Sequence, residues 1–150
     1  MDINKFKGYT ISKELYEFKG KTYAGWRYKY YTKGQYVLVD IINEVLEHKK
    51  TYYWSIGLTI GDFEDDYHCK KYHEQKLITG RIGVTGLLFA KAVIQHFEKQ
   101  LSYLYPNHKN IIYCQWTDNR RRKAYAYALK KMGYKYGIRK FGLCLWKEVK

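Results

Sequence analysis

The strongest constraint on the fold is a helical pattern that stands between two strand-like runs. Residues 51–60 and 111–116 are rich in β-branched and aromatic side chains, and we predict a strand for each. Strand–helix–strand order favours a parallel strand pair joined by a right-handed crossover. The apolar positions of the helix between them recur at alternating steps of three and four, which is one face of a helix: Leu87, Ala90, Ile94, Phe97, Leu101 and Leu104.

The C-terminal part predicts a second helix and a last strand. Thr117-Asp118-Asn119 supplies residue types that cap helix N-termini, and Gly133 suits a helix end, so we predict a helix over residues 119–132. Residues 143–149 alternate loosely and predict the last strand. The order of elements indicates an α/β (or α+β) fold around a mixed sheet.

The N-terminal third predicts a hairpin followed by an ambiguous segment. Residues 9–18 and 22–31 are strand-like and are joined at Gly20, which is typical of a turn. In residues 35–50, Leu38, Ile41, Ile42 and Val45 fit one helix face, although 37–42 would also serve as a strand. We predict a helix for this segment.

Length and composition indicate one folded domain over residues 1–150. The chain is 46% hydrophobic and 19% aromatic, enough to form a core without a metal or disulfides. Cys69, Cys114 and Cys144 are widely spaced without a CxxC pair, and the latter two lie in apolar runs, which predicts buried thiols. No apolar run reaches the ~20 residues of a membrane span and the N-terminus lacks a signal-peptide core, so we expect a cytoplasmic protein.

Positive charge is concentrated at the C-terminal end. The net charge is +14, and residues 101–150 hold 12 Lys and Arg against 2 Asp and Glu, a balance of +10. Such asymmetry predicts an anionic partner, which includes a phosphate-bearing cofactor, nucleic acid or an acidic protein. The excess of Lys over Arg, with abundant Tyr, Ile and Asn, suggests an AT-rich genome and a bacterial or bacteriophage source.

Three glycines open the long helix, in the segment ITGRIGVTGLLF. Gly80, Gly83 and Gly86 are spaced three apart with Arg81 between them. Glycines ahead of a helix N-terminus let the backbone approach a phosphate, and the helix dipole favours the negative charge. Neither the Rossmann nor the P-loop motif is present, so on spacing alone a plain turn is favoured over a phosphate site.

In its wider order the sequence resembles the GNAT superfamily of N-acetyltransferases. The family's pyrophosphate loop, roughly [QR]-x-x-G-x-[GA], aligns Gly80 with its first position and Gly83-Val84-Thr85 with its end. The run IIYCQWTDNRRRKAYAYALKKMGYKYG is similar to the family's next strand and helix, with Lys131-Met132-Gly133-Tyr134 at the K-x-G-[FY] position. The resemblance covers about residues 51–150 and implies a largely antiparallel sheet with one parallel pair and flanking helices.

The resemblance implies transfer of an acetyl group from acetyl-CoA to an amine, by direct attack. The family's general acid is a tyrosine four residues before the glycine of its G-[FY] pair. That position is Leu129 here, so Tyr125 and Tyr127 are the candidate substitutes. The cofactor-binding residues it implies are Gly80, Arg81, Ile82, Gly83, Val84, Thr85 and Gly86 at the first helix, with Asn119 and Arg122 at the second.

The polar segment 61–77, expected to be a loop or short hairpin, holds the candidate bases. Glu64 is chosen from a set that also includes Asp65, Asp66, His68 and His73. His68, Cys69 and His73 lack a second closely spaced ligand pair, so no metal site is predicted. The alternative function is a non-enzymatic nucleic-acid- or protein-binding module on the same fold, which the basic C-terminal third and Leu129 both favour.

Overall fold

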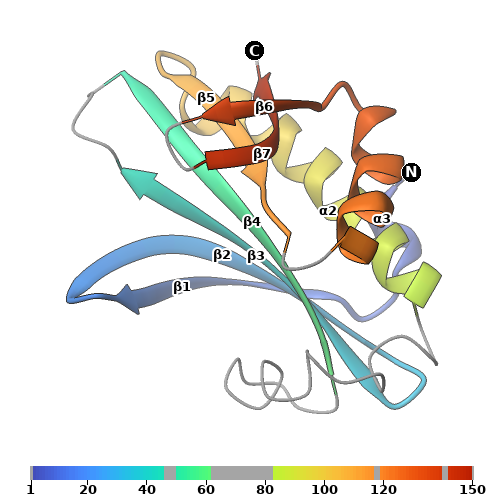
Figure 1. The fold of residues 1–150 in the computed structure, drawn as a ribbon. Coiled ribbons are helices and arrows are strands. Elements are labelled where there is room, and N and C mark those ends of the chain that lie inside the picture. Colours follow the sequence, from blue (N-terminus) through green and yellow to red (C-terminus); the bar gives the residue numbers. More distant parts are fainter. Residues whose placement is uncertain (1, 46–49, 62–82, 117–118, 140–141, 150) are drawn as a thin grey trace.

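A computed structural model describes residues 2–45, 50–61, 83–116, 119–139 and 142–149. One short 3-10 turn, seven strands and two helices make up these parts (Figure 1). In chain order they are η1 (Ile3–Lys5), β1 (Thr10–Phe18), β2 (Lys21–Thr32), β3 (Gln35–Val45), β4 (Thr51–Gly61), α2 (Gly83–Leu104), β5 (Lys109–Cys114), α3 (Asn119–Lys130), β6 (Lys135–Arg139) and β7 (Gly142–Val149).

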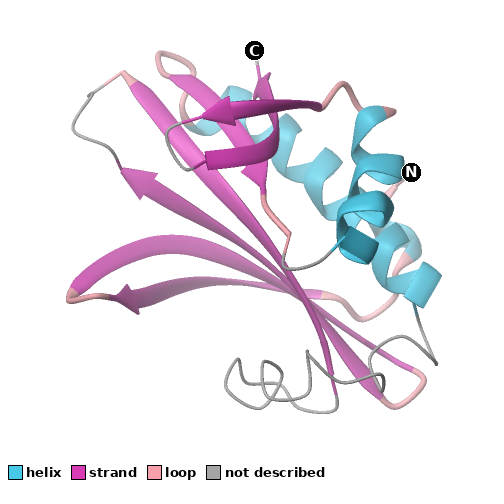
Figure 2. Cartoon of the chain, viewed as in Figure 1, coloured by secondary structure: helices cyan, strands magenta, loops and turns pink. Residues whose placement is uncertain are grey.

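The strands form one mixed sheet in the order β1-β2-β3-β4-β5-β7-β6. β4 and β5 are parallel, and every other neighbouring pair is antiparallel. The parallel pair is joined through α2, which confirms the prediction drawn from the helical pattern. The fold class is therefore α+β, with a mostly antiparallel sheet and two helices (Figure 2).

The first three strands form a meander with two tight turns. Lys19 and Gly20 join β1 to β2, and Lys33 and Gly34 join β2 to β3. All four residues have positive φ, between 48° and 78°, as two-residue hairpin turns of the right twist require. The predicted hairpin at Gly20 is confirmed.

The predicted helix over residues 35–50 is wrong, because its first part is strand β3. Val37, Val39 and Ile41 are fully buried toward the helices, whereas Leu38 and Asp40 are buried on the far face of the sheet, opposite α2 and α3. A strand buried on both faces shows a continuous apolar run instead of clean alternation. Such a run also matches the apolar face of a helix. Pairing with β2 and β4 makes this segment a strand and not a helix.

Both helices pack on one face of the sheet (Figure 2). α2 buries Phe89, Phe97 and Leu101, and the Phe97 ring meets the Trp54 indole edge-on with 5.0 Å between centroids. The predicted helix is thus confirmed, beginning at Gly83. Among the described helices, none combines the length and the apolar character that a membrane crossing needs.

The C-terminal part contains one strand that the sequence did not reveal. α3 ends at Lys130, and the chain turns through Gly133 (φ 94°), whose amide donates to the Lys130 carbonyl oxygen at 3.1 Å. β6 follows at the edge of the sheet; in its short sequence, KYGIR, a central glycine separates the two strand-forming residues, Tyr136 and Ile138. β7 agrees with the predicted last strand, and Cys114 and Cys144 are buried free thiols as predicted.

Candidate functional site

The sheet opens between β4 and β5 at the point where their pairing stops. The last parallel pair is Ile56 with Cys114. β4 continues to Gly61 and, in the parts of the chain that the structure describes, pairs beyond Ile56 with β3 alone. The backbone of residues 57–61 therefore has one edge that faces the opening instead of a neighbouring strand.

An apolar cleft lies on the helix side of this opening. Its cavity volume is about 30 Å³, and among the described residues Lys91 is the one charged side chain in its lining. Side chains from β4, from the end of β5 and from both helices surround it: Ile56, Leu58, Leu87, Ala90, Lys91, Ile94, Cys114, Tyr125, Ala128 and Leu129. We call it the apolar cleft.

The first turn of α2 lies against the end of β4, where Gly86 faces Ile60. A Cβ at Gly86 would lie 2.6 Å from Ile60 Cδ1, so a larger residue there would require the end of the Ile60 side chain to move. Val84 is exposed and Thr85 half-buried. The α2 N-terminus, with the positive end of its helix dipole, therefore lies near the part of β4 that has one strand neighbour among the described residues.

The two candidate tyrosines of α3 lie on different sides of that helix. Tyr125 lines the apolar cleft together with Leu129, which is 4% exposed. Tyr127 is 72% exposed, and the Lys131 ammonium lies 4.2 Å from its ring centroid. The structure therefore brings Tyr125 to the cleft and leaves Tyr127 away from it.

Cys114 contributes a neutral thiol to the cleft. Burial raises the pKa of Cys114 to about 12, with a smaller contribution from Cys144. A thiol attacks as the thiolate, so the protonated Cys114 is a poor nucleophile at neutral pH. Its place in the site is that of an apolar wall.

Arg122 lies at a second depression on the outer side of α3, and it does not line the apolar cleft. We call this depression, of about 430 Å³, the basic groove; it is lined by Arg122, Lys123, Ala126, Tyr127, Lys130, Lys131 and Tyr136. Arg122 Nε is buried and has no hydrogen-bond partner within the described residues. Asn119, the other candidate at this helix, is the first residue of α3.

Several candidate residues lie outside the described part of the chain. Among them are Glu64 and the loop residues Gly80, Arg81 and Ile82. His68, Cys69 and His73 also lie there. Within the described ranges, no cluster of three or more His, Cys, Asp or Glu side chains could hold a metal ion.

The structure also reveals a carboxylate that sequence reasoning missed. Strand alternation places Glu44 on the far face, where the Tyr113 hydroxyl donates to Glu44 Oε2 at 2.6 Å. Burial and this hydrogen bond raise the pKa of Tyr113 well above its usual value. Tyr113 pairs with Ser55, one residue before the β4–β5 pairing ends. Reading 35–50 as a strand would have shown Glu44 sharing a face with Asp40.

The far face has open space at one position near this carboxylate. Gly57, the next far-face position on β4 after Ser55, has no described atom within 4 Å of where a Cβ would stand. Beside it, Asp40 is buried and accepts hydrogen bonds from Arg27 Nε at 2.7 Å and from the Tyr16 hydroxyl at 2.6 Å.

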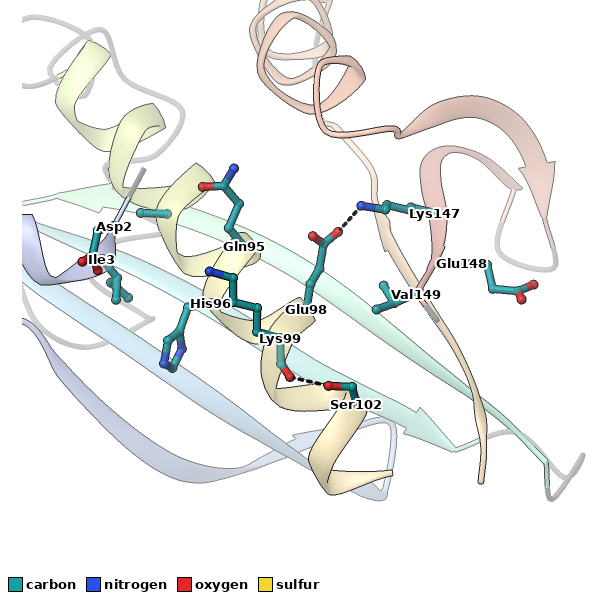
Figure 3. Close-up of a pocket in the computed structure, with 11 residues that line it drawn as sticks. Asp2, Ile3, Gln95, His96, Glu98, Lys99, Ser102, Lys147, Glu148 and Val149 are labelled. Atoms are coloured by element: carbon teal, nitrogen blue, oxygen red, sulfur yellow. Dashed lines mark hydrogen bonds and ion pairs between the residues drawn. The ribbon is translucent and has the colours of Figure 1, made fainter. Parts of the chain in front are cut away.

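A larger polar pocket of about 960 Å³ lies along the outward side of α2, between η1 and the end of β7 (Figure 3). Two of its charged groups pair with each other: Glu98 lies 2.9 Å from Lys147, and Glu98 also accepts from the Tyr134 hydroxyl at 3.1 Å. His96 Nδ1 lies 3.0 Å from the Tyr28 hydroxyl, and burial with the Lys99 charge lowers the pKa of His96. These contacts tie α2 to the sheet and offer no group aimed at a ligand.

Comparison with known proteins identifies no relative of this chain. No protein-family model matches the chain, and neither a curated protein nor a solved structure matches it. The functional argument therefore rests on the opening between β4 and β5 and on the residues around it.

Proposed function

We propose that the chain is an acyl-CoA-dependent N-acyltransferase that moves an acetyl group from acetyl-CoA to an amine by direct attack. The observation that carries the proposal is the apolar cleft at the end of the β4–β5 pairing, with the α2 N-terminus beside it. The sheet order, with one parallel pair and a second helix before the last two strands, supports the resemblance to the GNAT superfamily.

The residues present fit the acyl end of the cofactor. The apolar lining suits an acetyl thioester, and its volume of about 30 Å³ matches that end alone. An extended amide-bearing arm would lie along the free edge of β4, which offers backbone donors and acceptors as an added strand would need. The pyrophosphate would meet the α2 N-terminus at Gly83, Val84 and Thr85, with Gly80, Arg81 and Ile82 preceding them.

Acetyl-CoA supplies an activated thioester, and the chain supplies position and protons. Tyr125 is proposed as the general acid that protonates the leaving thiolate, because it lines the cleft where Leu129 fills the family's position. Cys114 is protonated at neutral pH, which favours one-step transfer over an acyl-cysteine route. The amine must lose a proton, for which Glu44 on the far face and Glu64 are the candidates.

Calorimetric titration with acetyl-CoA tests the proposal directly. We expect saturable binding of acetyl-CoA, followed by thiol release when a panel of primary amines is added. Gly83→Asp should abolish binding, because a carboxylate would occupy the place of the pyrophosphate. An acidic residue in the first helical turn favours the helix, so this variant should remain folded. Gly83→Asn, of equal size and no charge, is the matched control and should bind at least about 10-fold more tightly than Gly83→Asp.

The second candidate function is the non-enzymatic binding module. Leu129 is buried at the position of the usual general acid, and the basic groove offers a separate place for an anionic partner. Absence of acetyl-CoA binding at millimolar concentration would overturn the acyltransferase proposal and leave this one.

A further inference from the structure

The basic groove combines positive charge with accessible aromatic rings. Four cations line it, from Arg122, Lys123, Lys130 and Lys131, and none of the described residues of its lining is acidic. The +10 balance of residues 101–150 is thus concentrated partly on one side of one helix. Most of its lining residues come from α3, and Tyr136 of the edge strand β6, which follows α3 in the chain, completes it (Figure 1).

Two tyrosine rings of the groove are fixed by contacts with lysines. The Lys131 ammonium lies 4.2 Å from the Tyr127 ring centroid, and the Lys130 ammonium lies 4.6 Å from that of Tyr136. Trp116 also meets Tyr136 edge-on, with 5.7 Å between centroids. Tyr127 and Tyr136 nevertheless remain 72% and 38% exposed, so each keeps ring surface for a ligand.

Two further observations indicate that this region suits anions. Arg122 Nε is buried at the groove and lacks an acceptor in the described chain, although a buried donor normally has one. On the other face of β6, Lys135 and Arg139 lie 4.5 Å and 4.3 Å from the Trp146 ring centroid. Cations therefore lie beside aromatic rings on both faces of the edge strand.

We propose that the basic groove binds single-stranded nucleic acid, with phosphates against the lysines and Arg122 and bases stacked on Tyr127 and Tyr136. Charged grooves with aromatic platforms bind single strands because unpaired bases expose their faces. A duplex hides those faces, and an acidic peptide has none. The site is separate from the apolar cleft, so this inference does not rest on the acyltransferase proposal.

Fluorescence anisotropy with the full chain and a labelled 20-nucleotide thymidine strand tests the groove. The variant Lys123→Gln/Lys130→Gln/Lys131→Gln should lose at least about 10-fold in affinity at moderate salt. Its dependence of log K on log salt should become shallower by about 2, from three lost phosphate contacts. The matched control, Lys5→Gln/Lys7→Gln/Lys21→Gln, removes the same charge from exposed sites at the other end of the chain and should change affinity by less than about 3-fold.

Tyr127→Ala separates stacking from charge and should weaken binding about 5- to 100-fold with an unchanged salt slope. An RNA strand of the same length distinguishes the two sugars, and either one binding supports the proposal. Equal losses in the two triple variants, tighter binding of a duplex, or equal binding of polyglutamate would each overturn it. Thermal melting of every variant excludes unfolding as the cause.

Discussion

Tyr125 and Tyr127 are separated by one residue, yet they belong to two different environments on opposite sides of α3. The inner side, with Tyr125, Ala128 and Leu129, closes the apolar cleft at the end of the β4–β5 pairing. The outer side, with Tyr127 and the lysines of the basic groove, faces an open and positively charged surface. One short helix therefore forms a wall of both candidate sites.

The comparison shows that neighbouring residues of one helix can line separate surfaces. Arg122 lies at the basic groove, whereas Tyr125, Ala128 and Leu129 of the same helix line the apolar cleft. Charge on the outer side and apolar surface on the inner side can thus be varied independently.

The largest expected effect is a loss of stability. Only a substitution on the inner side of α3 should cause it. Leu129→Ala removes a side chain that is 4% exposed, which should lower the free energy of unfolding by about 2–5 kcal/mol. Tyr127→Ala, at a position 72% exposed, should lower it by less than about 0.5 kcal/mol. Urea unfolding of both variants measures the difference, and equal losses would contradict the division of α3 into two sides.

Filling the cleft should separate the two binding activities. Ala128→Trp places an indole where we propose that the acetyl group lies, and it should weaken acetyl-CoA binding at least about 100-fold, or about 2.8 kcal/mol. Binding of the thymidine strand should change by less than about 2-fold, because the substitution is on the inner side. The lysine-to-glutamine groove variant should show the converse pattern. If either of these two variants lost both binding activities while remaining folded, the two ligands would share one site.

Tyr125→Phe tests chemistry on the inner side without changing its shape. If the hydroxyl protonates the leaving thiolate, the rate of acetyl transfer should fall about 10- to 100-fold. This loss reaches the lower end of the rate enhancement that a general acid contributes. The calorimetric Kd for acetyl-CoA should stay within about 2-fold. Tyr127→Phe is the matched control on the outer side and should leave the rate unchanged. An equal loss of rate in Tyr127→Phe would contradict the assignment of Tyr125 as the general acid.

Much of the fold could be predicted because several segments have patterns that no competing structure satisfies. The helix face of α2, the β-branched run of β4 and the hairpin at Gly20 each point to one structure. β3 could not be predicted, because burial on both faces removes the alternation that identifies a strand. β6 was not predicted either, because it is only five residues long, has a glycine at its centre and depends on pairing with β7.

The site was predictable where position along one helix decides the matter. Helix periodicity keeps Tyr125 and Leu129, four residues apart, on one side of α3 and turns Tyr127 away from it, as the structure shows. Glu44 could not be found, because its nearness to Tyr113 depends on β4 lying between β3 and β5. The contact between Gly86 and Ile60 could not be predicted either, because the spacing of the glycines does not show which strand the helix meets.

The smallest expected effect is that of replacing Cys114. It tests whether this residue serves the apolar cleft by contact alone and not as a nucleophile. With a pKa of about 12, about one thiol in 100,000 is ionised at pH 7, and this fraction rises tenfold with each pH unit. Cys114→Ala should therefore keep the transfer rate within about 3-fold and leave its pH profile unchanged near neutrality. Intact-mass measurement after incubation with acetyl-CoA at pH 7 should show no acetyl group on the thiol. An acetylated Cys114, or a rate lost in Cys114→Ala, would require a two-step transfer. The apolar surroundings that shape the cleft are also what keep this thiol protonated, so both properties should change together if a charge is introduced beside it.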